Sequence, residues 1–420
     1  MERTPCSLLV GHAAQVVTLD AGAGGVPSSP GGLEALPVFA QGAVAVEGER
    51  IAAVGPEREL RARFEPREML DAGGGLVIPA FVDAHTHPAF AAGRAQEFQW
   101  RSEGRNYVEI ARRGGGILAS VRAVRAAGEE ELALAVAAHF RRMQRSGTAS
   151  CEAKSGYGLS TAEELKSLRA IRTAARETGM EVFPTFLGAH AVPEEHRGDP
   201  DRWLAILCEE SLPAVAEAGL ARAADIYIEA HAFDLARARR YLERARELGF
   251  ALRVHAEQFA TLGGATLAAE LGAECADHLE ALDDAGLEAL ASSGRTFAGL
   301  LPAVAHFLRQ KADAPARRLI QAGVPWFLAT DFNPGTCYTP SLPEVIHFAR
   351  IRLRLSPLEA LAGATLFAAA SLGAGDRKGR LAPGLDADLA VLELTDLQEL
   401  GYAFGENPVR HLISRGRVVF

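Results

Sequence analysis

The chain has 420 residues, which exceeds one average domain and suits a large barrel accompanied by a smaller module. Hydrophobic residues make up 48% and charged residues 23% of the chain, so a large globular core can be buried. The formal net charge of -9 is not accompanied by basic clusters, which argues against nucleic acid or an anionic membrane as a partner.

The five cysteines are widely scattered and odd in number. This pattern does not predict a disulfide framework and indicates a reducing compartment. The first residues lack a signal-peptide pattern, and no apolar run reaches the roughly 18–20 residues that span a bilayer. We therefore expect a cytoplasmic protein without a transmembrane segment.

Short strands and turns are predicted over the first 70 or so residues of the chain. The β-favouring segments are residues 7–9, 15–19, 42–46 and 51–54, with a hairpin turn at 48–49 between the last two. Residues 21–32 are rich in Gly, Pro and Ser, which predicts a loop.

From residue 76 to about residue 372, short apolar runs alternate with amphipathic helical stretches. The apolar runs are 77–82, 149–152, 182–187, 226–229, 251–255, 296–300 and 326–330, with a weaker candidate at 273–278. Helical segments include 129–146, 161–178, 235–248 and 262–271. Repeated strand–helix units imply a parallel sheet, and about eight of them fit a closed (β/α)8 barrel. A doubly wound sheet would give the same alternation, but polar residues recur just after the apolar runs, as a shared barrel mouth requires.

The tail, residues 379–420, returns to strands and turns, with β-like runs at 388–394 and 412–419. We therefore predict an α/β fold with a TIM-type (β/α)8 barrel over residues 76–372. Residues 1–75 and 373–420 are predicted to form one small β-sandwich module from both ends of the chain.

His85 and His87 directly follow the first apolar run of this barrel. Alternate side chains of a strand share a face, so these two imidazoles can chelate one ion. Imidazole suits Zn, Fe, Ni or Cu. A His-x-His pair alone fits two half-buried or surface histidines equally well.

His255 and Asp331 end two further apolar runs, where barrel strands deliver side chains to the C-terminal mouth. Together with His85 and His87 they make three imidazoles and one carboxylate. Such a set leaves coordination positions for water, which is typical of a catalytic metal site. Taken singly, His255 would be a core or capping histidine and Asp331 a helix N-cap.

Three other residues carry two interpretations each. His278 and His190 also follow strand candidates, and each is either a catalytic group or a hydrogen-bonded histidine at a strand end. Asp277 is a poor orienting partner for His278, because neighbours on a strand face opposite ways. Lys154 is either a carboxylated, metal-bridging lysine of the kind found in some barrel hydrolases or an exposed loop lysine, and we favour the loop.

Segment 75–87, Gly-Leu-Val-Ile-Pro-Ala-Phe-Val-Asp-Ala-His-Thr-His, resembles the first barrel strand of the amidohydrolase superfamily. Segments 154–159 (KSGYGL), 186–191 (FLGAHA) and 330–335 (TDFNPG) together resemble the imidazolonepropionase family within it. The terminal module matches more loosely, through residues 383–384 and 386–389.

The resemblance implies a hydrolase that opens the cyclic amide of 4-imidazolone-5-propanoate to N-formimidoyl-L-glutamate in histidine degradation. It implies one divalent ion, Zn or Fe, held by His85, His87, His255 and Asp331. Asp331 would take a proton from the attacking water, which His278 would orient. The resemblance also suggests a homodimer.

The same resemblance assigns residues to the substrate. Arg94 would grip the propionate through two parallel hydrogen bonds, whereas without the resemblance it would be a surface salt-bridge residue. The remaining substrate positions implied are Tyr107, Tyr157, His190, Gln258, Asn333, Gly335 and Thr336.

Gln258 departs from the related single-metal deaminases, which carry His-x-x-Glu where this chain has 255–258 ending in Gln. An amide can hydrogen-bond the substrate ring but cannot shuttle a proton, and Glu257 would point away from the site. Two alternatives stay open: a metal-dependent deaminase or cyclic amidase acting on another heterocycle, and a metal-free barrel that serves as a binding module.

Overall fold

The computed structural model describes residues 3–20, 32–33, 35–105, 109–110 and 113–420. Its largest sheet has eight strands in the order β15-β14-β13-β12-β11-β10-β9-β8, and every neighbouring pair is parallel. The predicted fold class, a (β/α)8 barrel with a β-module from the termini, is confirmed. The strands are β8 (Phe81–Asp83), β9 (Thr148–Lys154), β10 (Glu181–Ala189), β11 (Ala223–Tyr227), β12 (Ala251–Ala256), β13 (Cys275–His278), β14 (Phe297–Leu300) and β15 (Trp326–Leu328).

The barrel closes just beyond the ends of its first and last strands. Thr86 and Phe332 form an isolated parallel bridge. The amide of His87 donates to the carbonyl of Phe332 at 2.9 Å, and the amide of Asp331 donates to the carbonyl of His85 at 3.0 Å. Closure therefore brings the segment that follows β8 against the segment that follows β15, and both carry predicted metal ligands.

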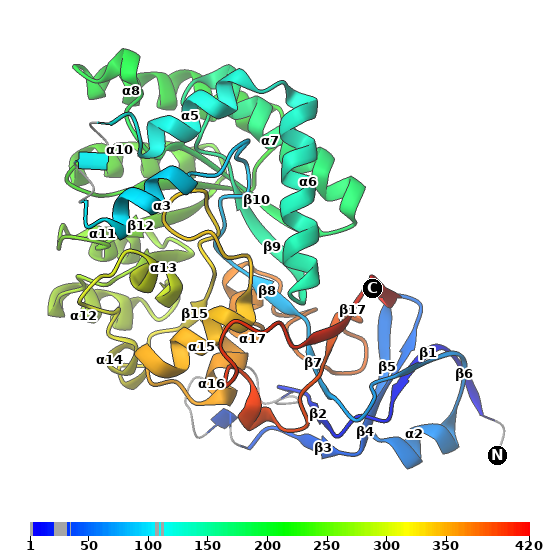
Figure 1. Cartoon of the computed structure of the whole chain (residues 1–420). Helices are drawn as coiled ribbons and strands as arrows, with labels where there is room; N and C mark the ends of the chain where they lie inside the picture. The colour runs from blue at the N-terminus through cyan, green and yellow to red at the C-terminus, as the bar shows by residue number, and fades with distance from the viewer. Residues whose placement is uncertain (1–2, 21–31, 34, 106–108, 111–112) are drawn as a thin grey trace.

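Helices surround the barrel between successive strands (Figure 1). The four helices predicted from the sequence are present as α6 (Glu129–Arg145), α7 (Thr161–Thr178), α10 (Leu235–Glu247) and α11 (Gly264–Leu271). The others of eight or more residues are α3 (Ala95–Ser102), α5 (Ile117–Ala126), α12 (Asp284–Ser293) and α15 (Leu342–Arg352). Shorter helices are α2 (Glu57–Arg63), α8 (Pro200–Ile206), α9 (Leu212–Glu217), α13 (Pro302–Phe307), α14 (Ala316–Gln321), α16 (Pro357–Gly363) and α17 (Leu366–Ser371).

Helix α7 shows why these segments are helical. The Ser160 hydroxyl accepts a hydrogen bond from the amide of Glu163 at the N-terminus, and Gly179 ends the helix in the left-handed conformation at φ 70°. Leu168 and Ile171, three residues apart, are buried on one face. The sequence therefore fixes both ends of the helix and the face that packs on the barrel.

The terminal module has two sheets, drawn at the lower right of Figure 1 with both chain ends beside it. The four-stranded sheet has the order β5-β4-β1-β6, and the six-stranded sheet the order β18-β17-β16-β7-β2-β3. Their strands are β1 (Thr4–Gly11), β2 (Gln15–Val17), β3 (Val38–Ala40), β4 (Gly42–Glu47), β5 (Arg50–Pro56), β6 (Phe64–Asp71), β7 (Leu76–Pro79), β16 (Leu389–Leu392), β17 (Val409–Ser414) and β18 (Arg417–Val418).

The apolar run at 77–82 was expected to be a single barrel strand, and this prediction is wrong. β7 pairs with β16 and β2 in the six-stranded sheet, and only β8 belongs to the barrel. Ala80 alone separates the two strands, so an unbroken apolar run passes between two different sheets. The domain limits at 75/76 and 372/373 stay a prediction. β7 begins just after the first limit, yet it pairs with strands of the terminal module.

Within the part of the chain that the structure describes, no helix combines the length and the apolar character needed to traverse a bilayer.

Candidate metal centre and active site

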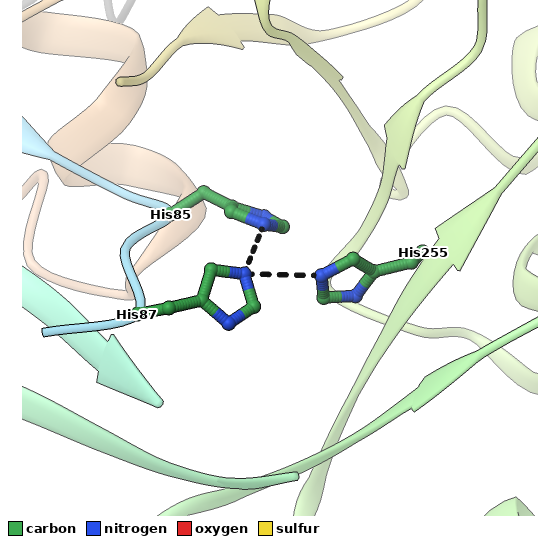
Figure 2. A group of neighbouring side chains, drawn as sticks. All are labelled: His85, His87 and His255. Atoms are coloured by element: carbon green, nitrogen blue, oxygen red, sulfur yellow. Dashed lines mark hydrogen bonds between the residues drawn. The ribbon is translucent and has the colours of Figure 1, made fainter. Parts of the chain in front are cut away.

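Four predicted metal ligands lie together at the barrel mouth. His85 Nε2 is 3.2 Å from His87 Nε2, which is 3.3 Å from His255 Nε2, so three imidazoles face one point (Figure 2). Asp331 Oδ1 lies 3.1 Å from His87 Nε2 and 3.5 Å from His85 Nε2. The side chains of all four are at most 5% exposed.

Two of the imidazoles are oriented by buried carboxylates. His85 Nδ1 lies 2.6 Å from Asp277 Oδ2, and His255 Nδ1 lies 3.1 Å from Asp225 Oδ1. Because a carboxylate accepts the Nδ1 proton, the Nε2 lone pair is left to bind an ion. Neither aspartate was predicted in this role.

The spacing of the donors fits a tetrahedral divalent ion. Zn–N bonds of about 2.0–2.1 Å place two nitrogens of a tetrahedral site about 3.3 Å apart. The observed Nε2–Nε2 separations of 3.2 and 3.3 Å match this value. The ligand atoms of His85, His87 and His255 lie within 4.8 Å of one another, as do those of His85, His278 and Asp331. The residues present therefore suit one metal ion.

Burial and charge set the protonation of this cluster. Burial alone would raise the pKa of Asp331, but hydrogen bonds with His85 and His87 hold it well below its usual value. Burial lowers the pKa of His87 to about 4 and that of His278 to about 3. Both imidazoles are therefore neutral at pH 7, as a ligand or a hydrogen-bonding group must be.

Asp331 and His278 adopt backbone conformations that side chains rarely take. Their φ angles are 49° and 82°, in the left-handed region. Such strain is retained where the surroundings over-determine the geometry, and it clusters at functional sites. His278 is the last residue of β13 and Asp331 follows β15, and at these strand ends the left-handed backbone departs from strand geometry, which is why strand periodicity alone could not predict where the two side chains point.

A cavity opens beside the four proposed ligands, and its empty space, open solvent at the mouth included, is about 620 Å³. Its lining combines three of these ligands, all but His85, with aromatic, polar and aliphatic side chains: His87, Arg94, Ile117, Tyr157, His190, Tyr227, His231, His255, Gln258, Phe259, His278, Leu308, Asp331, Asn333 and Thr336. Most of the substrate residues predicted from the sequence are among them. Tyr107 lies outside the described residues.

Arg94 lies on the cavity wall at the start of α3, and its side chain is only 9% exposed. Its Nε lies 3.2 Å from Glu97 Oε1, and its Nη1 donates to Ser120 Oγ at 3.4 Å. A surface salt bridge, the alternative for this residue, does not describe a nearly buried guanidinium. The cavity therefore contains a fixed positive charge as well as the metal cluster.

The loop that follows Asp331 is organised by Asn333. Its Oδ1 accepts from the amides of Gly335 and Thr336 at 2.9 and 2.7 Å, and its Nδ2 donates to the carbonyl of Asp331 at 2.7 Å. The amide group of Asn333 is thus used mainly to hold the loop. Gly335 carries no side chain where the Arg94 guanidinium lies, since a Cβ there would come 1.4 Å from Arg94 Nη2.

Tyr227 is a cavity residue that the sequence did not reveal. Its hydroxyl donates a hydrogen bond to Gln258 Oε1 at 2.7 Å. With Oε1 engaged, the Nε2 donor of Gln258 is the end available to the cavity. The residue stands at the end of β11, where a barrel strand meets its mouth, and that position was the available signal.

Lys154 was expected in an exposed loop, and this prediction is wrong. The residue ends β9, and its side chain is 0% exposed. Glu257, by contrast, points away from the site as expected. Its carboxylate accepts hydrogen bonds from the amides of Gly264 and Ala265 at the start of α11.

Comparison with known proteins places the chain among hydrolases. The model of the amidohydrolase family matches residues 76–419, and the model of the imidazolonepropionase-like composite domain of bacteria matches residues 42–64. The chain is 45% identical to the imidazolonepropionase of Symbiobacterium thermophilum over 99% of this chain and 97% of the relative. It is 44% identical to that of Solibacter usitatus, over 97% of both chains.

Solved structures show the same fold at lower identity. An adenosine deaminase from Xanthomonas campestris with bound zinc aligns with a TM-score of 0.72 at 21% identity, covering 99% of this chain and 93% of that one. The guanine deaminase of E. coli aligns at 0.74 and 16% identity, covering 98% and 99%.

Proposed function

The chain belongs to the amidohydrolase family and, within it, to the imidazolonepropionases, and on that premise we propose how its own residues open the ring of 4-imidazolone-5-propanoate. The reaction adds water across a cyclic amide C–N bond and yields N-formimidoyl-L-glutamate. One observation supports the assignment of this chemistry to the barrel mouth: a metal-ligand cluster and a nearly buried arginine share one cavity.

His85, His87, His255 and Asp331 are the residues that would hold the metal ion. A divalent ion bound there would lower the pKa of a water molecule and polarise the ring carbonyl. Zn and Fe(II) both accept three imidazoles and a carboxylate, so we propose one Zn or Fe ion per subunit. The zinc of the related deaminase favours Zn as the first candidate to test.

Asp331 is proposed to carry the proton through the reaction. Because its pKa is held low, it is an ionised base before water attacks. It takes the proton as water attacks the carbonyl carbon and returns it to the ring nitrogen as the C–N bond breaks. His278, neutral and on the cavity wall, is proposed to orient the water through a hydrogen bond.

Arg94 is proposed to bind the propionate. A guanidinium held by Glu97 and Ser120 is already ordered, so little conformational entropy is lost when a carboxylate docks on it. Tyr157, His190 and Thr336 lie on the cavity wall, and we propose that all three contact the ring. His190 Nδ1 is tied to the carbonyl of Gly156 at 3.0 Å, which leaves Nε2 as a hydrogen-bond acceptor.

Gln258 is proposed to donate to the substrate rather than to move a proton. Tyr227 occupies its Oε1, so Nε2 is left to donate a hydrogen bond to an acceptor on the ring. That acceptor is the carbonyl oxygen or an unprotonated nitrogen. Asn333 and Gly335 are proposed to act on the substrate mainly through the loop that they shape.

Elemental analysis of the purified protein, combined with an absorbance assay for loss of the imidazolone, tests this proposal. About one Zn or Fe per chain with rapid substrate loss is the expected result. Bound metal with turnover of guanine or cytosine, but not of the imidazolone, would support the metal centre and refute the proposed substrate. Neither metal nor turnover would favour a binding module.

We also propose a cytoplasmic homodimer. All five cysteines are free thiols, which suits a reducing compartment. Light scattering of the purified protein distinguishes a dimer near twice the 44.6 kDa of one chain from a monomer.

A further inference from the structure

A fully buried lysine lies beneath the proposed metal centre. Lys154 Nζ is 2.7 Å from Glu152 Oε1 and 2.8 Å from Asp225 Oδ2, and all three side chains are at most 1% exposed. A buried ammonium destabilises a protein unless it is paired, so this position needs both carboxylates. The mechanism above makes no use of Lys154, and none of the cavity residues is Lys154.

Each of these carboxylates supports a different part of the ligand set. Asp225 uses its other oxygen, Oδ1, to hold His255 Nδ1 at 3.1 Å. Glu152 uses its other oxygen, Oε2, to accept from the amide of Thr86 at 3.1 Å, and its carbonyl accepts from the Thr86 hydroxyl at 2.6 Å. Thr86 is the residue between His85 and His87.

One cation therefore joins two parts of the site that lie far apart in the sequence, the segment after the first barrel strand β8 and His255 on the fifth strand β12. The backbone amide of Lys154 adds a third link, since it donates to the carbonyl of Thr86 at 3.0 Å. We propose that Lys154 is a positioning residue of the metal centre. It holds Asp225 and Glu152 in place, so that His255 and the His85–His87 segment present their lone pairs at one point. This inference rests on the proposed ligand set.

The same contacts exclude the carboxylated form of this lysine. Carboxylation would place a third anionic group beside Glu152 and Asp225, in a region where both are 0–1% exposed. Lys154 here supplies a positive charge to the supports of a single ion, instead of a ligand that bridges two.

Binding of Co²⁺ to metal-stripped protein, measured by competition with a chelator, tests the proposal without turnover. We expect Lys154→Met to weaken Co²⁺ binding about 10- to 100-fold, as loss of an outer support of a ligand does, and to alter the visible spectrum of the Co²⁺ form. Lys378→Met is the matched control. Lys378 is also buried, at 1% exposure, and paired with Asp388 at 2.8 Å, but it contacts none of the ligands. It should lose stability with unchanged Co²⁺ affinity and spectrum.

A double-mutant cycle separates positioning from general destabilisation. If Lys154 acts on His255 through Asp225, adding Lys154→Met to Asp225→Asn should cost clearly less affinity than Lys154→Met costs alone. Asp225→Asn also keeps the test open should Lys154→Met fail to fold, because parental Co²⁺ affinity and spectrum in Asp225→Asn would refute the proposal. Parental Co²⁺ affinity in Lys154→Met would also refute it. So would a double variant whose loss of Co²⁺ affinity equals the product of the losses in the two single variants. Absence of Co²⁺ binding by the parent protein would instead refute the ligand set.

Discussion

Replacement of Gly335 by alanine should displace the arginine proposed to bind the propionate. The new Cβ would lie 1.4 Å from Arg94 Nη2 and 1.9 Å from Cζ, whereas ordinary contact begins at 3.4 Å. The guanidinium must therefore retreat by 3.4 − 1.4, about 2 Å. The backbone itself tolerates alanine, because the φ of Gly335 is not in the left-handed region.

A shift of this size breaks at least one of two hydrogen bonds to a carboxylate, since such bonds tolerate only a few tenths of an ångström. A charge-assisted hydrogen bond contributes about 1.5–3 kcal/mol, which corresponds to a roughly 10- to 150-fold rise in KM. We expect kcat to change much less, because Asp331 and His278, and not Arg94, are proposed to act at the bond that breaks. Arg94→Ala removes the guanidinium altogether, so its KM should rise at least as much as that of Gly335→Ala.

Steady-state kinetics on the imidazolone measure both constants, and Gly93→Ala is the control. Gly93 adjoins Arg94, but the atoms nearest to a Cβ there would be those of Tyr338, at an ordinary contact distance of 3.5 Å or more. A parental KM in Gly335→Ala would show that Arg94 does not bind the propionate, and an equal rise in Gly93→Ala would show that the effect is not specific to the Arg94 contact. A thermal unfolding midpoint close to that of the parent shows that the effect is local.

Three further substitutions test the metal ligands, the amide of Gln258 and a partly buried ion pair. His255→Ala should abolish turnover and bound metal while circular dichroism stays parental, and near-normal turnover would contradict the ligand set. Tyr227→Phe removes the donor that fixes Gln258 and should raise KM several-fold, by about the 0.5–1.5 kcal/mol of one hydrogen bond; an unchanged KM would show that the amide is fixed by other means. Burial opposes ionisation of Glu181, but Arg377 and Lys378 lower its pKa from 4.5 to about 2. Its stabilisation is therefore complete above pH 4.5 and lost as the pH falls towards 2, so urea unfolding of Glu181→Gln should converge with the parent in acid and diverge at pH 7.

The strands and helices were predictable because each carries its own periodicity. Helix α7 matches its predicted limits at both ends, since Ser160 and Gly179 mark them in the sequence. The run at 77–82 was misassigned for the opposite reason. Buried strands of two different sheets have the same apolar composition, and Ala80 between them gives no turn signal.

The proposed ligands were accessible to sequence reasoning because each follows an apolar run. Their supports were not, because pairing depends on distance in space. Asp277 lies 192 residues from His85, and Asp225 lies 30 residues from His255. Lys154 was misjudged since a lysine is usually exposed, and its burial depends on two carboxylates, Glu152 on the same strand β9 and Asp225 on β11.

The pairing of β7 with β16 has a consequence for the order of folding. Residues 76–79 are made early and residues 389–392 late, so the barrel strands all leave the ribosome before β16 exists. Until then β7, with the sequence Leu-Val-Ile-Pro, has one open hydrogen-bonding edge, the kind of edge that recruits other chains. The nascent protein must hold this strand next to the proposed metal ligands until residues 389–392 arrive, so premature termination before β16 would favour aggregation over a shortened enzyme.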